Sequence, residues 1–214
     1  EHYEEDLAKL QAKFKQVIDQ GVRQIAILAD DFWNPGGQNG LRLLNDMTEW
    51  LKEVKKEYPD MKMTIPYVPY DYMGNGSSQE LQILKQAPDN VQIVMTGGRV
   101  WGEVTDNFTS TFTNNVGRGP FMWINWPCTD NSKKHLIMGG YDTFLHPGVE
   151  PSKIQGIMLN PMQQSEPSKV AIFGNASYAW NIWETKEEAE EIWNASFSFV
   201  DHNSAISNEA SDAL

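Results

Sequence analysis

The chain has 214 residues, of which 29 are acidic and 17 basic, so its formal net charge is −12 at pH 7. This charge argues against a nucleic-acid partner, because phosphates and an acidic surface repel each other. The sequence contains no apolar run of the roughly 18 residues that a membrane span needs. Its one cysteine, Cys128, excludes an internal disulfide and a cysteine-based metal cluster.

The first predicted elements are a helix and a short strand. The helix covers residues 4–20 and ends at Gly21. The next apolar run, residues 24–29, predicts a strand that is buried on both faces and ends at the acidic pair Asp30 and Asp31. A turn over residues 34–40 follows.

Helices and strands then alternate to the end of the chain. Further strands are expected at residues 61–68, 91–95, 121–125 and 154–159. Helices are expected at 44–54, after a capping box at 77–80, from about 105, from about 167, and after a second capping box at 185–188. Strands alternating with helices predict an α/β fold with a parallel sheet of five β/α units, either an open doubly wound sheet or part of an eight-fold barrel.

Polar and aromatic side chains gather at or just after the carboxyl ends of these strands, where α/β folds keep their chemistry. They are Asp30, Asp31, Tyr70, Tyr72, Thr96, Asn125, Asp130 and Asn160. One shared pocket is the simplest explanation for such residues in five successive units.

The residue types in this pocket narrow the chemistry. No serine or cysteine nucleophile has a histidine motif beside it, and Gly36, Gly37 and Gly40 read as a turn rather than a phosphate-binding loop. Carboxylates, amides, Tyr and Trp are typical of sugar recognition, and two acids in different environments are what glycoside hydrolysis requires. No metal site or cofactor is expected.

Five sequence blocks, in order, carry a resemblance to a known family. They are Ala29-Asp-Asp-Phe32, Val68-Pro-Tyr-Asp-Tyr72, Met95-Thr-Gly97, Trp123-Ile-Asn-Trp-Pro-Cys-Thr-Asp130 and Leu159-Asn-Pro-Met162. Over residues 4–185 the chain resembles glycoside hydrolase family 84, the β-N-acetylglucosaminidases, which include O-GlcNAcases and bacterial proteins labelled hyaluronidases.

The resemblance implies a (β/α)8 TIM barrel and substrate-assisted catalysis. The acetamido oxygen of the sugar attacks the anomeric carbon and forms an oxazoline intermediate. Asp30 matches the carboxylate that orients the acetamido N–H, and Asp31 matches the general acid and base. The expected substrates are glycoproteins and other glycoconjugates that carry N-acetylglucosamine.

The resemblance also implies substrate-binding residues. Tyr72 matches the tyrosine that contacts the acetamido group, although an alignment anchored on Thr64-Ile-Pro66 favours Tyr70. Thr96 and Val100 match residues of the acetamido pocket, and Trp123 matches a pocket wall. Asn125 matches an amide beside the acid, and Asp130 and Asn160 match ligands of the sugar hydroxyls.

The family barrel has about three further strand units before its aspartate pair, and a barrel usually needs about 250 residues. We therefore expect residues 1–201 to be the C-terminal portion of a catalytic barrel and 202–214 to be a polar tail. Such a fragment is expected to be inactive alone. Its exposed barrel edge would pair with another copy, be covered by the final helices, or leave the chain prone to aggregate. The resemblance suggests a secreted or cell-surface bacterial protein.

Two other interpretations stay open. The chain could be a non-catalytic carbohydrate-binding remnant that uses the same pocket. Alternatively, the aspartate pair could bind magnesium in a receiver-like signalling domain, in which Thr96 would act as the switch threonine.

Overall fold

The computed structural model describes residues 2–32, 37–130, 134–135 and 139–200. The expected tail at 202–214 and part of the expected turn at 34–40 lie outside these residues. Within the described part of the chain, no helix combines the length and the apolar character needed to cross a membrane.

The described residues form one α/β unit with a single parallel sheet. The five strands are β1 (Ile27–Leu28), β2 (Ile65–Val68), β3 (Val91–Met95), β4 (Phe121–Ile124) and β5 (Gly156–Leu159), and they lie side by side in chain order. The α-helices are α1 (Tyr3–Asp19), α2 (Gln38–Glu57), α3 (Gln79–Leu84), α4 (Asp106–Val116), α5 (Ser165–Trp180) and α6 (Lys186–Val200). The expectation of five parallel strands in one α/β sheet is confirmed. Between β4 and β5 the described residues form two short 3-10 helices, Tyr141–Thr143 and Pro151–Lys153, and no α-helix.

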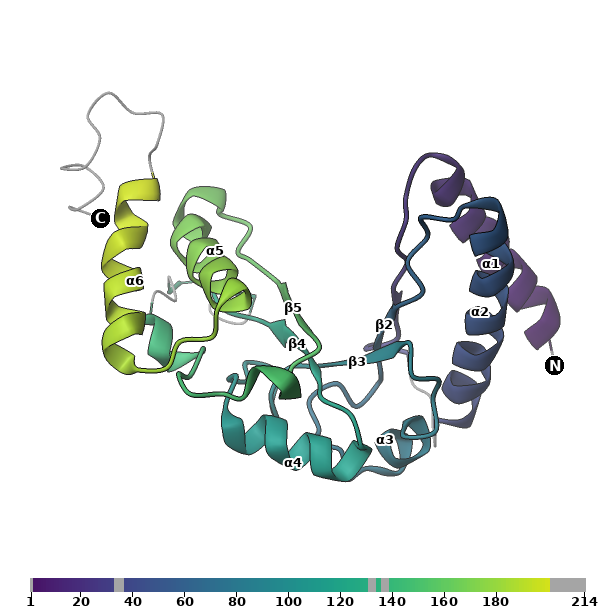
Figure 1. The fold of residues 1–214 in the computed structure, drawn as a ribbon, viewed down its shortest axis with the longest axis horizontal. Coiled ribbons are helices and arrows are strands. Elements are labelled where there is room, and N and C mark those ends of the chain that lie inside the picture. Colours follow the sequence, from purple (N-terminus) through teal and green to yellow (C-terminus); the bar gives the residue numbers. More distant parts are fainter. Residues whose placement is uncertain (1, 33–36, 131–133, 136–138, 201–214) are drawn as a thin grey trace.

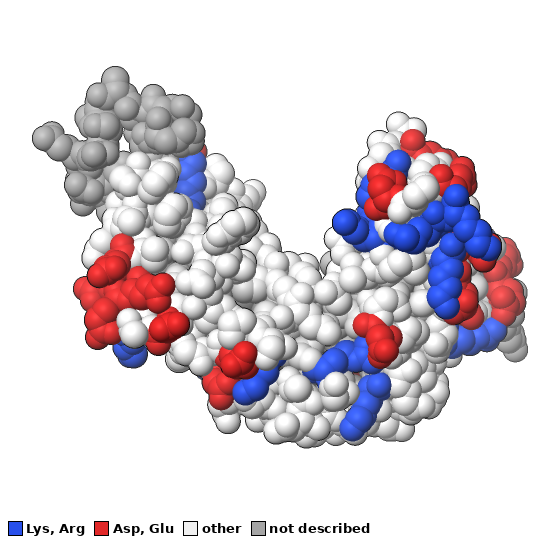
Figure 2. All heavy atoms as spheres, viewed as in Figure 1, with Lys and Arg blue, Asp and Glu red and all other residues white. Residues whose placement is uncertain are grey.

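The molecule is an open crescent (Figure 1), with α1 and α2 at one end, α5 and α6 at the other, and α3 and α4 along the outside of the curve. The ends of the sheet do not meet, because β1 pairs with β2 and β5 pairs with β4 at opposite edges. Figure 2 shows that the concave surface between the two ends carries few charged side chains on this face. The architecture is therefore that of a partial barrel.

The two faces of the sheet differ in what covers them. Val91, Ile93 and Met95 of β3 belong to the core under the helices, so the alternation of side chains along a strand turns Gln92 and Val94 to the concave side. The strand register extends this concave row to the other strands, where it includes Leu28, Val68, Phe121, Trp123 and Met158.

The prediction that the first strand is buried on both faces is wrong. β1 contains only two residues, and Leu28 is 59% exposed. Ile27 packs against the core, but the concave side next to Leu28 is open. A continuous apolar run indicates that both faces of a strand are apolar. It does not indicate whether residues of this chain pack against both faces.

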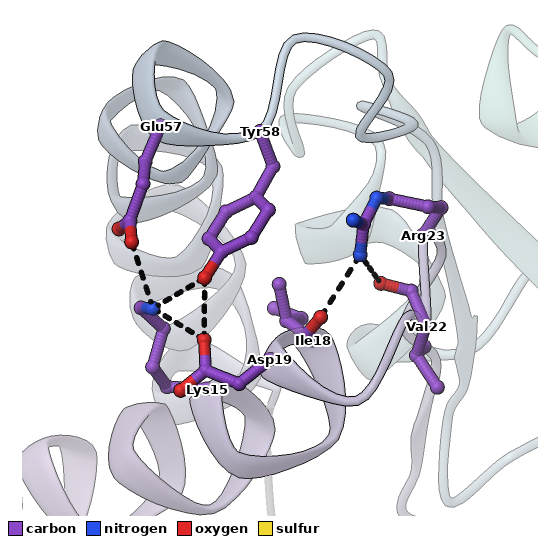
Figure 3. Close-up of polar contacts among 7 residues, drawn as sticks. All are labelled: Lys15, Ile18, Asp19, Val22, Arg23, Glu57 and Tyr58. Atoms are coloured by element: carbon purple, nitrogen blue, oxygen red, sulfur yellow. Dashed lines mark hydrogen bonds and ion pairs between the residues drawn. The ribbon is translucent and has the colours of Figure 1, made fainter.

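The start of the chain is fastened to α2 by the polar cluster in Figure 3. Lys15 donates to the hydroxyl oxygen of Tyr58 at 2.9 Å, and that hydroxyl donates to Asp19 at 2.6 Å. The hydrogen bond from Lys15 holds the pKa of Asp19 below its usual value. Arg23 donates to the carbonyls of Ile18 and Val22 and so closes the turn that leads into β1.

The expected capping boxes are borne out unequally. The side chains of Thr185 and Glu188 form a reciprocal cap at the N-terminus of α6. Thr185 accepts from the Glu188 amide, and Glu188 accepts from the Glu184 amide. In the first box, Ser78 caps α3 by accepting from Leu81. Glu80 does not close that box, because its carboxylate binds the loop after β2 instead.

Candidate active site

The carboxyl ends of the strands carry the expected polar row. Asp30, Thr96, Asn125 and Asn160 each lie two positions after a concave-facing residue of β1, β3, β4 or β5. Because side chains alternate along a strand, this spacing directs the row to the concave side of the crescent. Asp31 follows Asp30 in the same turn and is exposed, whereas Asp30 is half-buried.

Asn125 is the best-anchored residue of this row. It is 5% exposed, its Nδ2 donates to the carbonyl of Val100 at 2.8 Å, and its Oδ1 accepts from Asn160 Nδ2 at 3.0 Å. The backbone amide of Asn160 also donates to Ile124 at 2.9 Å. One amide side chain therefore joins the loops that follow β3, β4 and β5 and sets their relative positions.

Tyr72 is the tyrosine that lies near the acidic pair. Its ring packs on Trp123, with centroids 5.3 Å apart. Burial raises the pKa of the Tyr72 phenol above its ordinary value, and the charges of Asp31 and Asp30 raise it further. The phenol therefore lies within electrostatic range of both carboxylates, and the structure brings Tyr72 and Trp123 together with the aspartate pair.

Tyr70 has a different setting. It is 43% exposed, and its backbone amide donates to Glu80 Oε1 at 3.1 Å. Of the two tyrosines that the sequence left as alternatives, Tyr72 is the one whose ring packs on Trp123.

Thr96 is fully buried at the end of β3, and its polar atoms bind backbone. Its amide donates to the Tyr72 carbonyl at 2.9 Å, and its hydroxyl donates to the Arg99 carbonyl at 2.7 Å. The residue therefore ties the loop after β2 to the loop after β3. Val100 lies on this second loop, half-buried, and its carbonyl accepts from Asn125.

The loop after β3 depends on two glycines that the sequence reading did not single out. A Cβ on Gly102 would lie 1.9 Å from the Thr96 carbonyl oxygen, and Gly97 has a φ of +98°. A Cβ on Gly97 would lie 2.6 Å from the carbonyl oxygen of Glu103. The backbone therefore folds directly onto itself beside Thr96, and this close approach excludes any side chain.

Asp130 lies apart from the Asn125 and Asn160 pair. It is exposed and neighbours the buried Cys128, whose thiol pKa is raised by burial and further by the Asp130 carboxylate. Among the described residues, no hydrogen bond joins Asp130 to the other predicted site residues. Of the two loop histidines, His135 is exposed, and His146 Nε2 lies 2.8 Å from Glu103 Oε2.

Glu80 is a site-supporting residue that the sequence reading assigned to helix capping. It is 6% exposed and accepts hydrogen bonds from the amides of Tyr70 and Asp71 at 3.1 and 2.9 Å. Burial raises its pKa above the usual value, and the two amide donors oppose that rise. In the described part of the chain, no group of three or more His, Cys, Asp or Glu side chains is arranged to hold a metal ion.

Comparison with known proteins gives a consistent result. A family model described as beta-N-acetylglucosaminidase matches residues 1–214. The solved structure of CpGH84D is 33% identical in sequence, with a TM-score of 0.79 over 92% of this chain.

Two further structures share the fold. CpGH84B is 24% identical with a TM-score of 0.76 over 94% of this chain. A mutant of the Thermobaculum terrenum O-GlcNAc hydrolase is 23% identical with a TM-score of 0.64 over 92% of it. The chain spans 32%, 36% and 44% of the lengths of CpGH84D, CpGH84B and the Thermobaculum protein, respectively.

Proposed function

Because this chain belongs to the β-N-acetylglucosaminidase family of glycoside hydrolases, we propose that it carries the acid–base half of a site that removes β-linked N-acetylglucosamine from glycoconjugates. The observation that carries the proposal is the grouping of Asp30, Asp31, Tyr72 and Trp123 at one end of the sheet. Two adjacent carboxylates beside aromatic side chains fit the hydrolysis of a glycosidic bond, which needs a pair of acidic groups close to the bound sugar.

The reaction is substrate-assisted. The carbonyl oxygen of the 2-acetamido group attacks the anomeric carbon as the bond to the leaving oxygen breaks, and Asp31 donates its proton to that oxygen. Asp30 accepts a hydrogen bond from the acetamido N–H, which makes the carbonyl oxygen a better nucleophile. The product of this step is the bicyclic oxazoline in its N-protonated form, an oxazolinium ion whose N–H remains hydrogen-bonded to the Asp30 carboxylate. Asp31, now a carboxylate, removes a proton from water as the water opens the ring, so that free N-acetylglucosamine leaves.

The surrounding residues hold the sugar. The neutral phenol of Tyr72 donates to the acetamido oxygen, and Trp123 forms the wall behind it. Thr96 and Val100 shape the acetamido pocket through the backbone of their loop. Asn125 and Asn160 keep each other oriented and offer their remaining donors and acceptors to sugar hydroxyls, a task that Asp130 shares from the following loop.

The test uses the full-length protein and an aryl N-acetyl-β-glucosaminide. We expect turnover, tight inhibition by a thiazoline analogue of the bicyclic intermediate, and loss of turnover in Asp30→Asn even with an activated aryl group. Glu49→Gln, which removes an exposed acid of α2 outside the proposed site, is the control. Isolation of a covalent glycosyl-enzyme adduct would rule out the oxazoline route.

A carbohydrate-binding remnant remains the second candidate, because it would use the same pocket. It predicts binding of N-acetylglucosamine by calorimetry with no turnover of the aryl substrate. The receiver-like alternative loses its support, because the family match covers residues 1–214.

We also propose that the protein acts on glycoproteins outside the bacterial cell or at its surface. The proposal rests on the family resemblance alone. Detection of the protein in washed cells and culture supernatant, with a cytoplasmic marker as control, tests it.

A further inference from the structure

Glu80 is a buried carboxylate that the proposed chemistry does not use. It is 6% exposed, and its two oxygens accept separate hydrogen bonds from consecutive amides, those of Tyr70 and Asp71. A buried carboxylate is costly unless its oxygens are satisfied, and here the satisfying donors are backbone rather than side chain. The carboxylate therefore fixes a stretch of backbone.

The stretch that it fixes leads directly into Tyr72. On the other side of that residue, the Tyr72 carbonyl accepts from the amide of Thr96 at 2.9 Å. Tyr72 is thus held on its N-terminal side by Glu80 and at its own carbonyl by Thr96. Between these two anchors its ring reaches Trp123 and the aspartate pair.

Glu80 also lies close to the residue that precedes α2. A Cβ added to Gly37 would lie 3.1 Å from Cα and Cγ of Glu80, so the two backbone segments approach closely there. Gly37 has a φ of +74° and immediately precedes α2. Glu80 therefore binds the loop before Tyr72 and packs beside the start of α2.

We propose that Glu80 is a positioning residue, which sets the Tyr72 phenol against Asp30 and Asp31 by binding the amides of the preceding loop. This inference rests on the proposed function. Only a carboxylate offers an acceptor oxygen to each of two neighbouring amides. Glutamine offers one oxygen and turns an NH₂ group toward the second amide, which would push the loop away.

A double-mutant cycle in the full-length protein tests the inference. The variants are Glu80→Gln, Tyr72→Phe and the double variant, assayed for kcat and KM on an aryl N-acetyl-β-glucosaminide. Because a misplacement of about 1 Å in an active site can cost about a hundredfold in rate, we expect Glu80→Gln to lower kcat/KM by roughly ten- to a hundredfold. In the Tyr72→Phe background the same change should cost less than about threefold, since the phenol that it misplaces is already gone.

The matched control is Glu49→Gln, which removes an exposed glutamate whose Oε1 lies 2.6 Å from Lys52. It should leave kcat/KM unchanged. Equal losses from Glu80→Gln in both backgrounds would mean that Glu80 acts through general stability, and would overturn the inference. A wild-type enzyme without turnover would instead remove the proposed function, so the two failures are distinguishable.

Thermal unfolding of every variant accompanies the kinetics. Should Glu80→Gln fail to fold, Glu80→Asp replaces it in the cycle, because aspartate keeps both oxygens and shortens their reach by one methylene. A loss in Glu80→Asp that Tyr72→Phe suppresses supports the positioning role. Wild-type kinetics in Glu80→Asp overturn it.

Discussion

The ring of Tyr72 lies on the indole of Trp123, with centroids 5.3 Å apart and the planes inclined by 31°. Tyr72 follows β2 and Trp123 belongs to β4, so the two rings belong to strands that are separated by β3. They meet because the sheet curves around its concave side. The amide of Thr96, at the end of β3, donates a hydrogen bond to the Tyr72 carbonyl. This contact gives one wall of the proposed sugar site.

The two tyrosines after β2 should behave differently when their hydroxyls are removed. We expect Tyr72→Phe to lower kcat/KM by on the order of ten- to a hundredfold. That is the contribution of a hydrogen bond to a group that is charged or becomes charged in the transition state. Tyr70→Phe, the matched control, should stay within about twofold of the wild type, a change of less than about 0.5 kcal/mol. The reverse order of losses would transfer the acetamido contact to Tyr70.

Asp31→Asn should separate substrates by leaving group. With a poor leaving group, loss of the general acid should cost about 10²- to 10⁴-fold in kcat/KM, because the departing oxygen needs a proton. With an activated phenolate the cost of bond breaking should be far smaller. A series of aryl N-acetyl-β-glucosaminides of graded phenol acidity measures this, and parallel losses across the series would exclude Asp31 as the acid.

Glu80 should make stability depend on pH in a defined direction. Burial raises its folded-state pKa, so the native state binds a proton more readily than the unfolded state. The stabilisation from this proton is fully present below the unfolded pKa of about 4.3 and is lost as the pH rises through the higher folded value. The free energy of unfolding of the wild type, minus that of Glu80→Gln, should therefore fall as pH rises from about 4 toward 7.

Urea unfolding at each pH measures that difference. A difference that grows with rising pH would mean that the amide donors outweigh burial and that the folded pKa is lowered.

Gly102 should tolerate no side chain. A Cβ there would lie 1.9 Å from the Thr96 carbonyl oxygen, and the Thr96 backbone is held by the hydrogen bond from its amide to the Tyr72 carbonyl. We expect Gly102→Ala to destabilise the protein by about 1–3 kcal/mol or more, as overpacking does, and to lower activity through the Thr96 loop. Gly139→Ala is the control, because its nearest neighbours lie at 3.5 Å. Equal unfolding temperatures for the two variants would contradict the close approach.

The edge of the sheet at β1 should drive self-association of the 214-residue chain. Leu28 is 59% exposed, and a groove of about 530 Å³ between α1, α2 and the end of β1 is lined in part by Ala29, Phe32, Leu7 and Leu10. An open apolar edge offers unpaired backbone groups to another chain. Sedimentation velocity should show concentration-dependent assembly that Leu28→Lys weakens and Val17→Lys, on α1, does not. A wild-type chain that stays monomeric at all concentrations would contradict this prediction. We also expect the 214-residue chain alone to show little glycosidase turnover, because its site is open.

Much of the fold was predictable because its signals are local. The apolar runs at 91–95 and 121–125 correspond to β3 and β4 within one residue, and the helix expected from about 105 is α4, which begins at Asp106. The burial of the first strand was predicted wrongly. Its apolar pattern indicates two buried faces, but no described residue covers the side chain of Leu28. Glu80 was assigned to the wrong partner for a similar reason. A glutamate three residues after a serine fits a capping box, but the carboxylate of Glu80 binds the amides of Tyr70 and Asp71 in the preceding loop, which the local pattern does not indicate.

By itself, the sequence determined the chemistry on offer: an acidic pair after the first strand, and aromatic and amide residues after the strands that follow. It also determined their order along the sheet edge, because parallel β/α units place every strand's carboxyl end on the same side. Only the tertiary structure decided which of these side chains meet. The curvature of the sheet brings Tyr72 to Trp123, the pairing of β4 with β5 brings Asn125 to Asn160, and the position of α3 brings Glu80 to the loop before Tyr72. Such contacts depend on how strands, helices and loops pack, and no local pattern of residues encodes them.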